Sequence, residues 1–254
     1  MKVSAVVISH GHADELVHSL PALDPQVDEL LVIANIPGSL PPDLPPGVRV
    51  LENAQPLSFA ANANLGAAHT EHGLVLIANP DAIPEPDAVE VLRAFVEERP
   101  RAGVAGPQML YSDGTWQASR RSFPTVGATL VRRTPLRLLF PPLRWQRHHY
   151  LLDERPDDPA PADTMLGAFL LLRRAMLDEI GGWDAGYRMY CEDIDLNYRA
   201  AKAGWDRWYV PAAVVHHEYA AVVDKRFLTR HTLWHARAMA RFLRKHPERL
   251  LALR

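Results

Sequence analysis

The sequence predicts an α/β protein built around a central, mostly parallel sheet. Three observations support this fold class. Short runs of apolar, often β-branched residues recur along the chain, as in strands that are covered on both faces. Segments of helical character separate these runs, and such alternation is typical of parallel sheets. Polar residues directly follow several runs, at the carboxyl ends of strands where such sheets bind ligands.

The strands are read from continuous apolar runs. Residues 3–8 are mostly β-branched, and residues 74–78 form a second uninterrupted apolar run. Prolines between positions 37 and 46 exclude regular pairing there. We predict strands at 3–8, 29–33, 48–51, 74–78, 103–109, 168–172 and 208–215.

The helices are read from their periodicity and from the residues that end them. Residues 86–98 form an amphipathic segment with an apolar face. The helix at 173–180 ends at Gly181-Gly182, and Gly204 ends the next one. We predict helices at 13–20, 59–68, 86–98, 173–180, 193–203 and 227–246.

The bulk composition sets limits on the class of protein. With 254 residues and 48% hydrophobic residues, the chain can bury a large core. The net charge of −2 gives no reason to expect a nucleic-acid partner. The single cysteine, Cys191, excludes an internal disulfide framework. Because no run approaches the ~20 apolar residues of a membrane span and the N-terminal run is too short for a signal peptide, we expect a cytoplasmic protein with at most peripheral contact at the inner face of a membrane.

Two acidic segments contain the candidate catalytic and metal-binding residues. Asn79-Pro80-Asp81 follows the strand at 74–78, and Glu192-Asp193-Ile194-Asp195 opens a helix. Carboxylates at strand ends can bind a divalent cation, and a second carboxylate nearby can accept a proton. The pair suggests metal-assisted group transfer to a hydroxyl. The alternatives are a simple Asn-Pro-Asp turn and acids that stabilise a helix N-terminus.

Several segments resemble a known family. Residues 58–66, SFAANANLG, resemble a GFAxAxNxG run, and residues 77–81, IANPD, resemble an LNPD variant of the DXD motif. Residues 166–174, then 181–184 with 190–196, and finally 214–217 resemble GAxxLxRR, GGFDE…YxEDxDL and VxHH. In this order the motifs resemble those of family-2 glycosyltransferases with the GT-A fold, in the bacterial rhamnosyltransferase-like branch.

The resemblance implies a role for each matching residue. Asp81 would bind Mg²⁺ or Mn²⁺ on the donor diphosphate, with His216 as a second ligand and His217 as its alternative. Asp193 would be the general base of an inverting transfer. The acceptor would contact Glu192, Asp195, Trp183 and Arg120. The nucleotide-sugar donor would contact Ser9, His10, Asn35, Asn64, Asn79, Asp81 and Gly167.

The resemblance also implies the substrates. The donor would be dTDP-rhamnose or a similar deoxysugar nucleotide, and the acceptor a polyprenyl-diphosphate-linked or other cell-envelope glycan. The family usually has an Asp at the end of its second strand, where this chain has Ala34-Asn35. A UDP-hexose or UDP-N-acetylhexosamine donor therefore remains an alternative, as does a binding module without turnover. A nucleotidyltransferase would need a Gly-rich basic loop, which residues 9–14 do not form.

The remaining segments complete the predicted organisation. Residues 1–222 would form the GT-A domain, with a donor half at 1–110 and an acceptor half at 111–222, and residues 223–254 would add a helical appendage. The last helix is basic and amphipathic, so it would either lie on a membrane or pack on the domain or on a second subunit. The irregular segment 120–163 has two alternative interpretations. It would either bind a polyprenyl-diphosphate acceptor or form a solvated loop with its own small apolar cluster. The residues concerned are Arg120, Arg121, Arg132, Arg133, Arg137 and Arg144, with the apolar Leu138, Leu139, Phe140 and Trp145.

Overall fold

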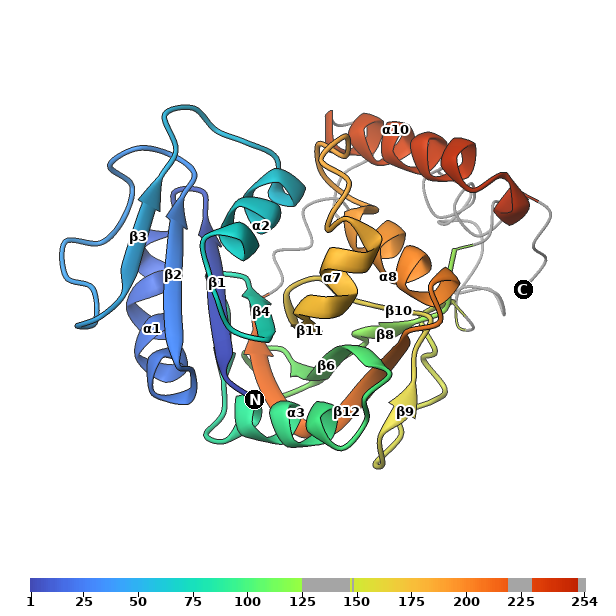
Figure 1. Cartoon of the computed structure of the whole chain (residues 1–254), viewed down its shortest axis with the longest axis horizontal. Helices are drawn as coiled ribbons and strands as arrows, with labels where there is room; N and C mark the ends of the chain where they lie inside the picture. The colour runs from blue at the N-terminus through green and yellow to red at the C-terminus, as the bar shows by residue number, and fades with distance from the viewer. Residues whose placement is uncertain (125–146, 148, 219–229, 251–254) are drawn as a thin grey trace.

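The computed structural model describes residues 1–124, 147, 149–218 and 230–250, and Figure 1 shows their arrangement. The arginines at 132, 133, 137 and 144 and the apolar cluster at 138–145 lie outside these residues. The centre is a ten-stranded sheet whose main path runs β3-β2-β1-β4-β11-β6-β12-β5. The central strands are β1 (Val3–Ser9), β2 (Glu29–Ala34), β3 (Arg49–Glu52), β4 (Leu74–Ala78), β6 (Ala102–Leu110), β11 (Phe169–Arg173) and β12 (Asp206–His217).

Short strands and helices complete the fold. The short strands are β5 (Ala82–Pro84), β7 (Trp116–Gln117), β8 (Arg120–Arg121), β9 (Ala160–Pro161) and β10 (Thr164–Met165). The helices are α1 (Ala13–Leu23), α2 (Phe59–Ala68), α3 (Ala88–Glu97), α7 (Arg174–Ile180), α8 (Glu192–Lys202) and α10 (Arg230–Lys245). Short 3₁₀ turns lie at Asp24–Gln26 and Pro247–Leu250.

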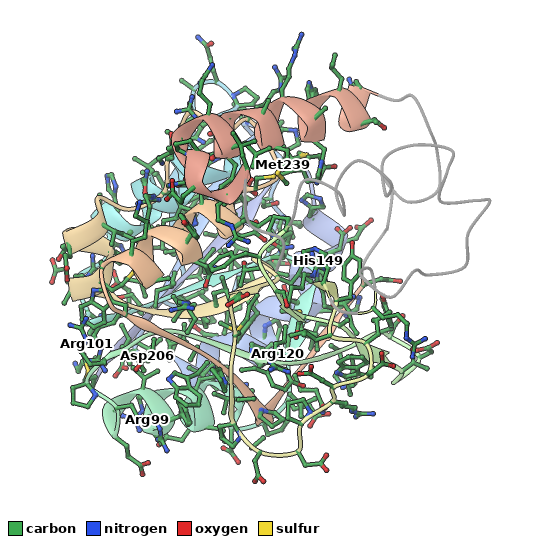
Figure 2. All side chains as sticks on the ribbon, turned by 90° about the vertical axis from the view of Figure 1, so that its right-hand side faces the viewer. Arg99, Arg101, Arg120, His149, Asp206 and Met239 are labelled. Atoms are coloured by element: carbon green, nitrogen blue, oxygen red, sulfur yellow. The ribbon has the colours of Figure 1, made fainter. Side chains whose placement is uncertain are left out.

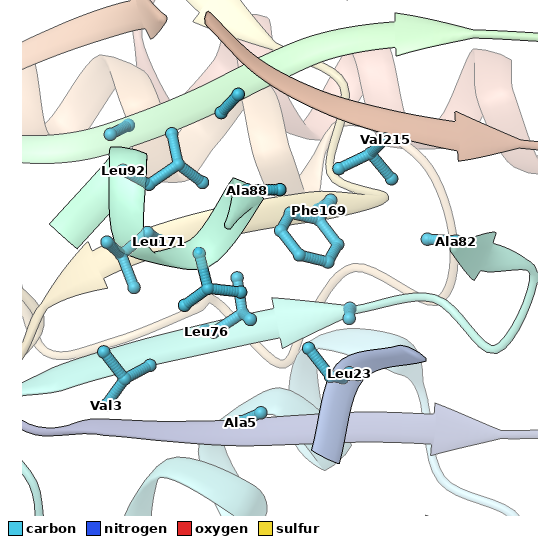
Figure 3. Close-up of a cluster of buried hydrophobic side chains, with 14 of the residues drawn as sticks. Val3, Ala5, Leu23, Leu76, Ala82, Ala88, Leu92, Phe169, Leu171 and Val215 are labelled. Carbon is cyan, nitrogen blue, oxygen red and sulfur yellow. The ribbon is translucent and has the colours of Figure 1, made fainter. Parts of the chain in front are cut away.

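The sheet is buried on both faces, as its uninterrupted apolar strands require. Along β1, Val3 and Ala5 point into one core cluster, while Val6 points into the other. Helices α1 and α3 cover the first face, shown in Figure 3, where Leu76 and Phe169 lie among their side chains. Helices α2, α7 and α8 cover the second face. The predicted α/β class is confirmed.

Helix α2 shows how the sequence determines close packing. Ser58 begins the helix, because its hydroxyl accepts a hydrogen bond from the Ala61 amide at 3.2 Å. Gly66 lies directly over β1, where a Cβ atom would come within 2.3 Å of Val6 Cγ1. Any larger side chain would therefore push α2 away from the sheet.

Strand β11 differs in direction from its neighbours. It runs antiparallel to both β4 and β6, whereas β1 is parallel to β2 and to β4. The beginning of β11 consequently lies beside the end of β4, with Phe169 opposite Ala78. This direction brings the preceding residues, including Gly167, to the same sheet edge as Asp81.

Strand β5 and both ends of β12 extend beyond the sequence prediction. Ala82–Pro84 pairs antiparallel with β12, with His217 opposite Ala82 and His216 opposite Ile83. The prolines around this segment had suggested a turn alone. Because β5 lies at the edge of the sheet, Pro84 does not interrupt a central ladder. The pairing carries β12 two residues beyond the predicted end and places its histidines at the edge of the site.

Helix α10 packs on α8 through an aromatic and apolar cluster. Phe242 is fully buried, and its ring lies 5.7 Å from that of Tyr198. Met239, labelled in Figure 2, is also buried there. The opposite side of α10 exposes Leu233 and the arginines at 230, 237 and 244. No helix within the described ranges is long and apolar enough to cross a membrane.

Candidate active site

A short segment before β11 contacts the chain segments that carry the candidate site residues. The Leu166 amide donates to the Ser119 carbonyl at 2.9 Å, and the Ala168 carbonyl accepts from the Asn79 amide at 2.7 Å. Between them, the Gly167 amide donates to the carboxylate of Asp193. The backbone of residues 166–168 therefore contacts the end of β4, the Asp193 carboxylate at the start of α8 and the chain beside β8.

Asp193 lies in the first turn of α8 with its carboxylate held in place. One oxygen accepts a hydrogen bond from the Ile194 amide at 2.8 Å. Glycine at position 167 leaves room for the Asp193 side chain. A Cβ atom on residue 167 would lie 3.3 Å from the Asp193 Cβ, which is a tight contact. Burial raises the pKa of Asp193, although the positive charge of Arg121 and these amide hydrogen bonds oppose the rise. A raised pKa makes a carboxylate a better proton acceptor near neutral pH.

Glu192 is a second buried acid beside Asp193. Its Oε2 is buried without a hydrogen-bond partner. Burial, together with the neighbouring charge of Asp193, raises the pKa of Glu192 to about 8. Glu192 is therefore mostly protonated at pH 7.

The turn that leads into these acids is strained. Tyr190 and Cys191 have φ angles of 73° and 63°, in the left-handed region that side chains other than glycine rarely adopt. Consecutive residues of this kind cost of order 1–3 kcal/mol each and occur mostly at functional sites. The fold therefore holds the start of α8 in a conformation that the local sequence does not favour.

Asp81 and His217 form a second charged pair at this edge. Asp81 Oδ1 lies 3.6 Å from His217 Nε2, and the opposite ring atom, Nδ1, lies 2.9 Å from Gln117 Oε1. Since that amide oxygen only accepts, Nδ1 carries the proton and the Nε2 lone pair faces Asp81. Burial raises the pKa of Asp81 and lowers that of His217. A neutral imidazole oriented from behind in this way is the usual form of a metal-ligating histidine.

These two donors fit a hard divalent cation that also binds a ligand. A carboxylate oxygen and an imidazole nitrogen suit Mg²⁺ or Mn²⁺, which fill their other positions with phosphate oxygens and water. The described part of the chain contains no cluster of three or more His, Cys, Asp or Glu side chains that could hold a metal.

The structure separates the two histidines. Side chains alternate along β12, so His216 points away from His217 and lies 3.0 Å from Glu85 Oε1. The ligand position predicted for His216 is therefore better filled by His217, the alternative named from the sequence. Gln117, which orients His217, gave no signal in the sequence, because its two-residue strand is too short to predict.

The predicted donor-binding residues at the ends of β1 and β2 are largely engaged with one another. Asn35 Oδ1 accepts from Asn53 and from the Leu57 amide, and its Nδ2 contacts His10 Nδ1 and the Leu57 carbonyl. Ser9 is buried, and its hydroxyl accepts from the His12 amide. Of these three residues, only His10 is exposed. Asn35 therefore orders the loop and contacts His10.

The side chain of Asn64 is hydrogen-bonded to the backbone of Trp183. The Asn64 side chain donates to the Trp183 carbonyl and accepts from the Trp183 amide, each at 2.8 Å. The Trp183 side chain is buried in the core beneath α8. Gly182 has a φ of 66°, and a Cβ there would lie 2.5 Å from Asn64 Oδ1. The motif thus connects α2 to the α7–α8 loop, and neither side chain has the contacts predicted for it.

Asp195 and Arg120 are also engaged away from the acids. Asp195 is fully buried and accepts hydrogen bonds from Arg199, Lys245 and His246 at 2.7–2.9 Å. Asp195 thus pairs with basic residues. Arg120, labelled in Figure 2, donates to the Pro161 carbonyl and contacts Glu154.

Comparison with known proteins places the chain in a family. The model for "Glycosyltransferase like family 2" matches residues 24–244. The chain is 33% identical over 189 residues to the N-acetylglucosaminyl-diphospho-decaprenol L-rhamnosyltransferase of Mycobacterium tuberculosis, covering 68% of this chain and 60% of that protein. It is 26% identical over 264 residues to the rhamnosyltransferase WbbL of Escherichia coli K12, covering 95% and 92% of the two chains. The chain belongs to glycosyltransferase family 2.

Solved structures agree with the fold. The crystal structure of GalNAc-T7 with UDP, GalNAc and Mn²⁺ aligns with a TM-score of 0.63 at 14% identity, covering 86% of this chain and 43% of that one. The mannosyltransferase PcManGT of Pyrobaculum calidifontis, in complex with GDP-Man and Mn²⁺, aligns with a TM-score of 0.56 at 14% identity, covering 87% and 58%. The predicted GT-A fold is confirmed. The chain spans 60% of the length of the mycobacterial relative, so its substrates are a matter for proposal.

Proposed function

We propose that this protein transfers a sugar, with inversion, from a nucleotide-sugar donor to a hydroxyl of a lipid-linked glycan. The observation that carries the proposal is the convergence at residues 166–168. The same backbone segment holds Asp193 through Gly167 and holds the strand end before Asp81 through Ala168. A proton acceptor and a pair of cation ligands thus have a fixed relation to each other.

The geometry supports an in-line displacement. The acceptor oxygen forms a bond to the anomeric carbon while the bond from that carbon to the diphosphate breaks. The hydroxyl proton passes to the carboxylate of Asp193, and the nucleoside diphosphate leaves with the bonding electron pair. Base catalysis of this kind contributes ~10²–10⁴-fold to the rate. A divalent cation, when bound at Asp81 and His217, would neutralise charge on the leaving diphosphate.

The relatives suggest the substrates. Both are named rhamnosyltransferases, and the mycobacterial one is named for a diphospho-decaprenol acceptor. We therefore propose dTDP-rhamnose or a similar donor and a polyprenyl-diphosphate-linked acceptor, with any membrane contact being peripheral. A UDP-hexose or UDP-N-acetylhexosamine donor is the second candidate. The reason is that hydrogen-bonded amides around Asn35 stand where the family usually has a strand-end carboxylate.

Nucleotide binding and turnover test the proposal together. Thermal shifts with UDP, GDP, dTDP and CMP, with and without Mn²⁺, identify the donor class, because a ligand of the native state raises its stability. Asp193→Asn should bind that donor normally and lose at least ~10²-fold in transfer. Glu192→Gln is the matched comparison, since Glu192 is mostly protonated at pH 7 and its amide analogue should retain more activity. The reverse ranking would make Glu192 the base, and the absence of binding by any nucleotide would contradict the transferase proposal.

A further inference from the structure

Arg121 occupies a position that the proposed chemistry does not yet use. It lies on β8, paired across the small second sheet with Thr164 of β10. Its neighbour Arg120 faces the other way, toward Pro161 and Glu154. Two residues earlier, Ser119 anchors the segment that holds Asp193. Arg121 is therefore attached to the same framework as the proposed base.

The guanidinium of Arg121 lacks the contacts that buried arginines usually make. Its Nε is buried without a hydrogen-bond partner, and the Tyr150 ring lies 5.2 Å from its Cζ. By contrast, Arg174 and Arg199 each donate to three groups in the protein. A guanidinium offers five donors in a planar fork. Within the described residues, no ion pair occupies the fork of Arg121.

The chain on either side of Arg121 places it beside the site. Gln117, four residues earlier in the same segment, contacts His217 Nδ1 at 2.9 Å. Thr164, which pairs with Arg121, lies three residues before Gly167. The positive charge of Arg121 also lowers the pKa of Asp193. Among the described residues, Arg121 forms no salt bridge with Asp193 or Asp81, so neither carboxylate occupies its donors.

An anion bound beside Arg121 would accept hydrogen bonds from its guanidinium group. We propose that Arg121 binds a diphosphate oxygen of a substrate, beside the pair formed by Asp81 and His217. Planar, bidentate recognition of phosphate is the geometry that favours arginine over lysine. The inference depends on the proposed transfer, in which both substrates carry a diphosphate: the donor and the lipid-linked acceptor. The chemistry is shared, and binding measurements separate the two sources.

The test compares Arg121→Met and Arg121→Lys with wild type. Arg93→Met, on α3 and paired with Glu90, is the matched control. Calorimetry with Mn²⁺ measures the affinity for the nucleoside diphosphate selected by the thermal screen, for the corresponding monophosphate, and for a short-chain prenyl diphosphate. Arg121→Met should weaken one diphosphate ligand roughly 10- to 100-fold and the monophosphate less, as the loss of a charge-assisted hydrogen bond predicts. Arg121→Lys should recover part of that loss.

The affected ligand identifies the source. A loss confined to the nucleoside diphosphate assigns Arg121 to the donor, and a loss confined to the prenyl diphosphate assigns it to the acceptor. Wild-type affinity of Arg121→Met for both diphosphates overturns the inference and leaves the proposed transfer intact. A wild-type protein that binds neither ligand overturns both. Melting temperatures show whether Arg121→Met is folded. If it is not, the test uses Arg121→Lys, which lacks the planar guanidinium, and asks whether it loses affinity for the nucleoside diphosphate or for the prenyl diphosphate.

Discussion

The Asp195 network makes a quantitative prediction about how α10 is held. Asp195 is fully buried and accepts from Arg199 and His246 as well as from Lys245, which also contacts Asp184. Asp195→Asn keeps the side-chain shape but removes the charge that these donors face. Removing one partner of a buried ion pair costs about 3–5 kcal/mol. The lower value applies here, because the asparagine oxygen keeps one acceptor.

The assay is thermal unfolding at pH 7. A loss of about 3 kcal/mol corresponds to roughly 6–12 °C for a domain of this size. Asp178→Asn is the matched control: its side chain is exposed, so it should change the free energy of unfolding by no more than about 0.5 kcal/mol. Equal melting temperatures of the two variants would refute the view that this network attaches α10 to α8.

The pH dependence of stability tests the same network independently. Burial alone would raise the pKa of Asp195, but hydrogen bonds from His246, Arg199 and Lys245 outweigh it and hold the pKa below its ordinary 3.8. A depressed pKa adds stability that is present above the unfolded-state value of about 3.9 and is lost as the pH falls through the folded-state value. The gap between wild type and Asp195→Asn should therefore stay constant down to about pH 4 and shrink below it.

Four further variants test the site itself. Gly167→Ala places a methyl group 3.3 Å from the Asp193 Cβ, so it should lower kcat while nucleotide affinity stays the same; unchanged kcat would contradict the positioning role of Gly167. Gln117→Leu releases His217 Nδ1 and should weaken Mn²⁺-dependent nucleotide binding ~10- to 100-fold, which calorimetry measures. His217→Ala should abolish that metal dependence and His216→Ala should not; the opposite result would restore the assignment made from the sequence.

The sequence predicted the fold well because burial on both faces leaves a strong local signal. The runs at 3–8 and 74–78 contain few polar residues, and the structure extends each strand by at most a residue. Helix α1 instead continues past Pro21 to Leu23, which is buried in the core. The burial of Leu23 offsets the backbone hydrogen bond that the proline removes.

The side-chain assignments were harder, because they depend on which way a residue faces. His216 and His217 are adjacent, and the register between β12 and β5 determines which one meets Asp81. That register follows from β5, a short edge strand among prolines with no strand signature. Asn62 and Asn64 lie two positions apart on α2 and so face differently, and tertiary packing sets their partners, Asn53 and Trp183.

Arg121 and Gln117 were not distinguished from the sequence for the same reason. Both lie on strands of two residues. β7 pairs with the longer β6, whereas β8 pairs with β10, which is also two residues long. Arg120 and Arg121 are chemically identical, and only the pairing of β8 with β10 directs one outward and the other toward Asp193. Such positions carry no periodic pattern, so no periodicity argument can orient them.

The first turn of α8 connects the proposed base, Asp193, to the C-terminal helix α10. At about 100° per residue, Asp193 and Asp195 face different sides of the helix. One meets the Gly167 amide, and the other meets Lys245 and His246 of the C-terminal segment. The strained residues Tyr190 and Cys191 immediately precede this turn. Because strain persists only where surrounding contacts determine the conformation, α10 acts as a support that holds the turn, and with it the proposed base, in its position at the sheet edge.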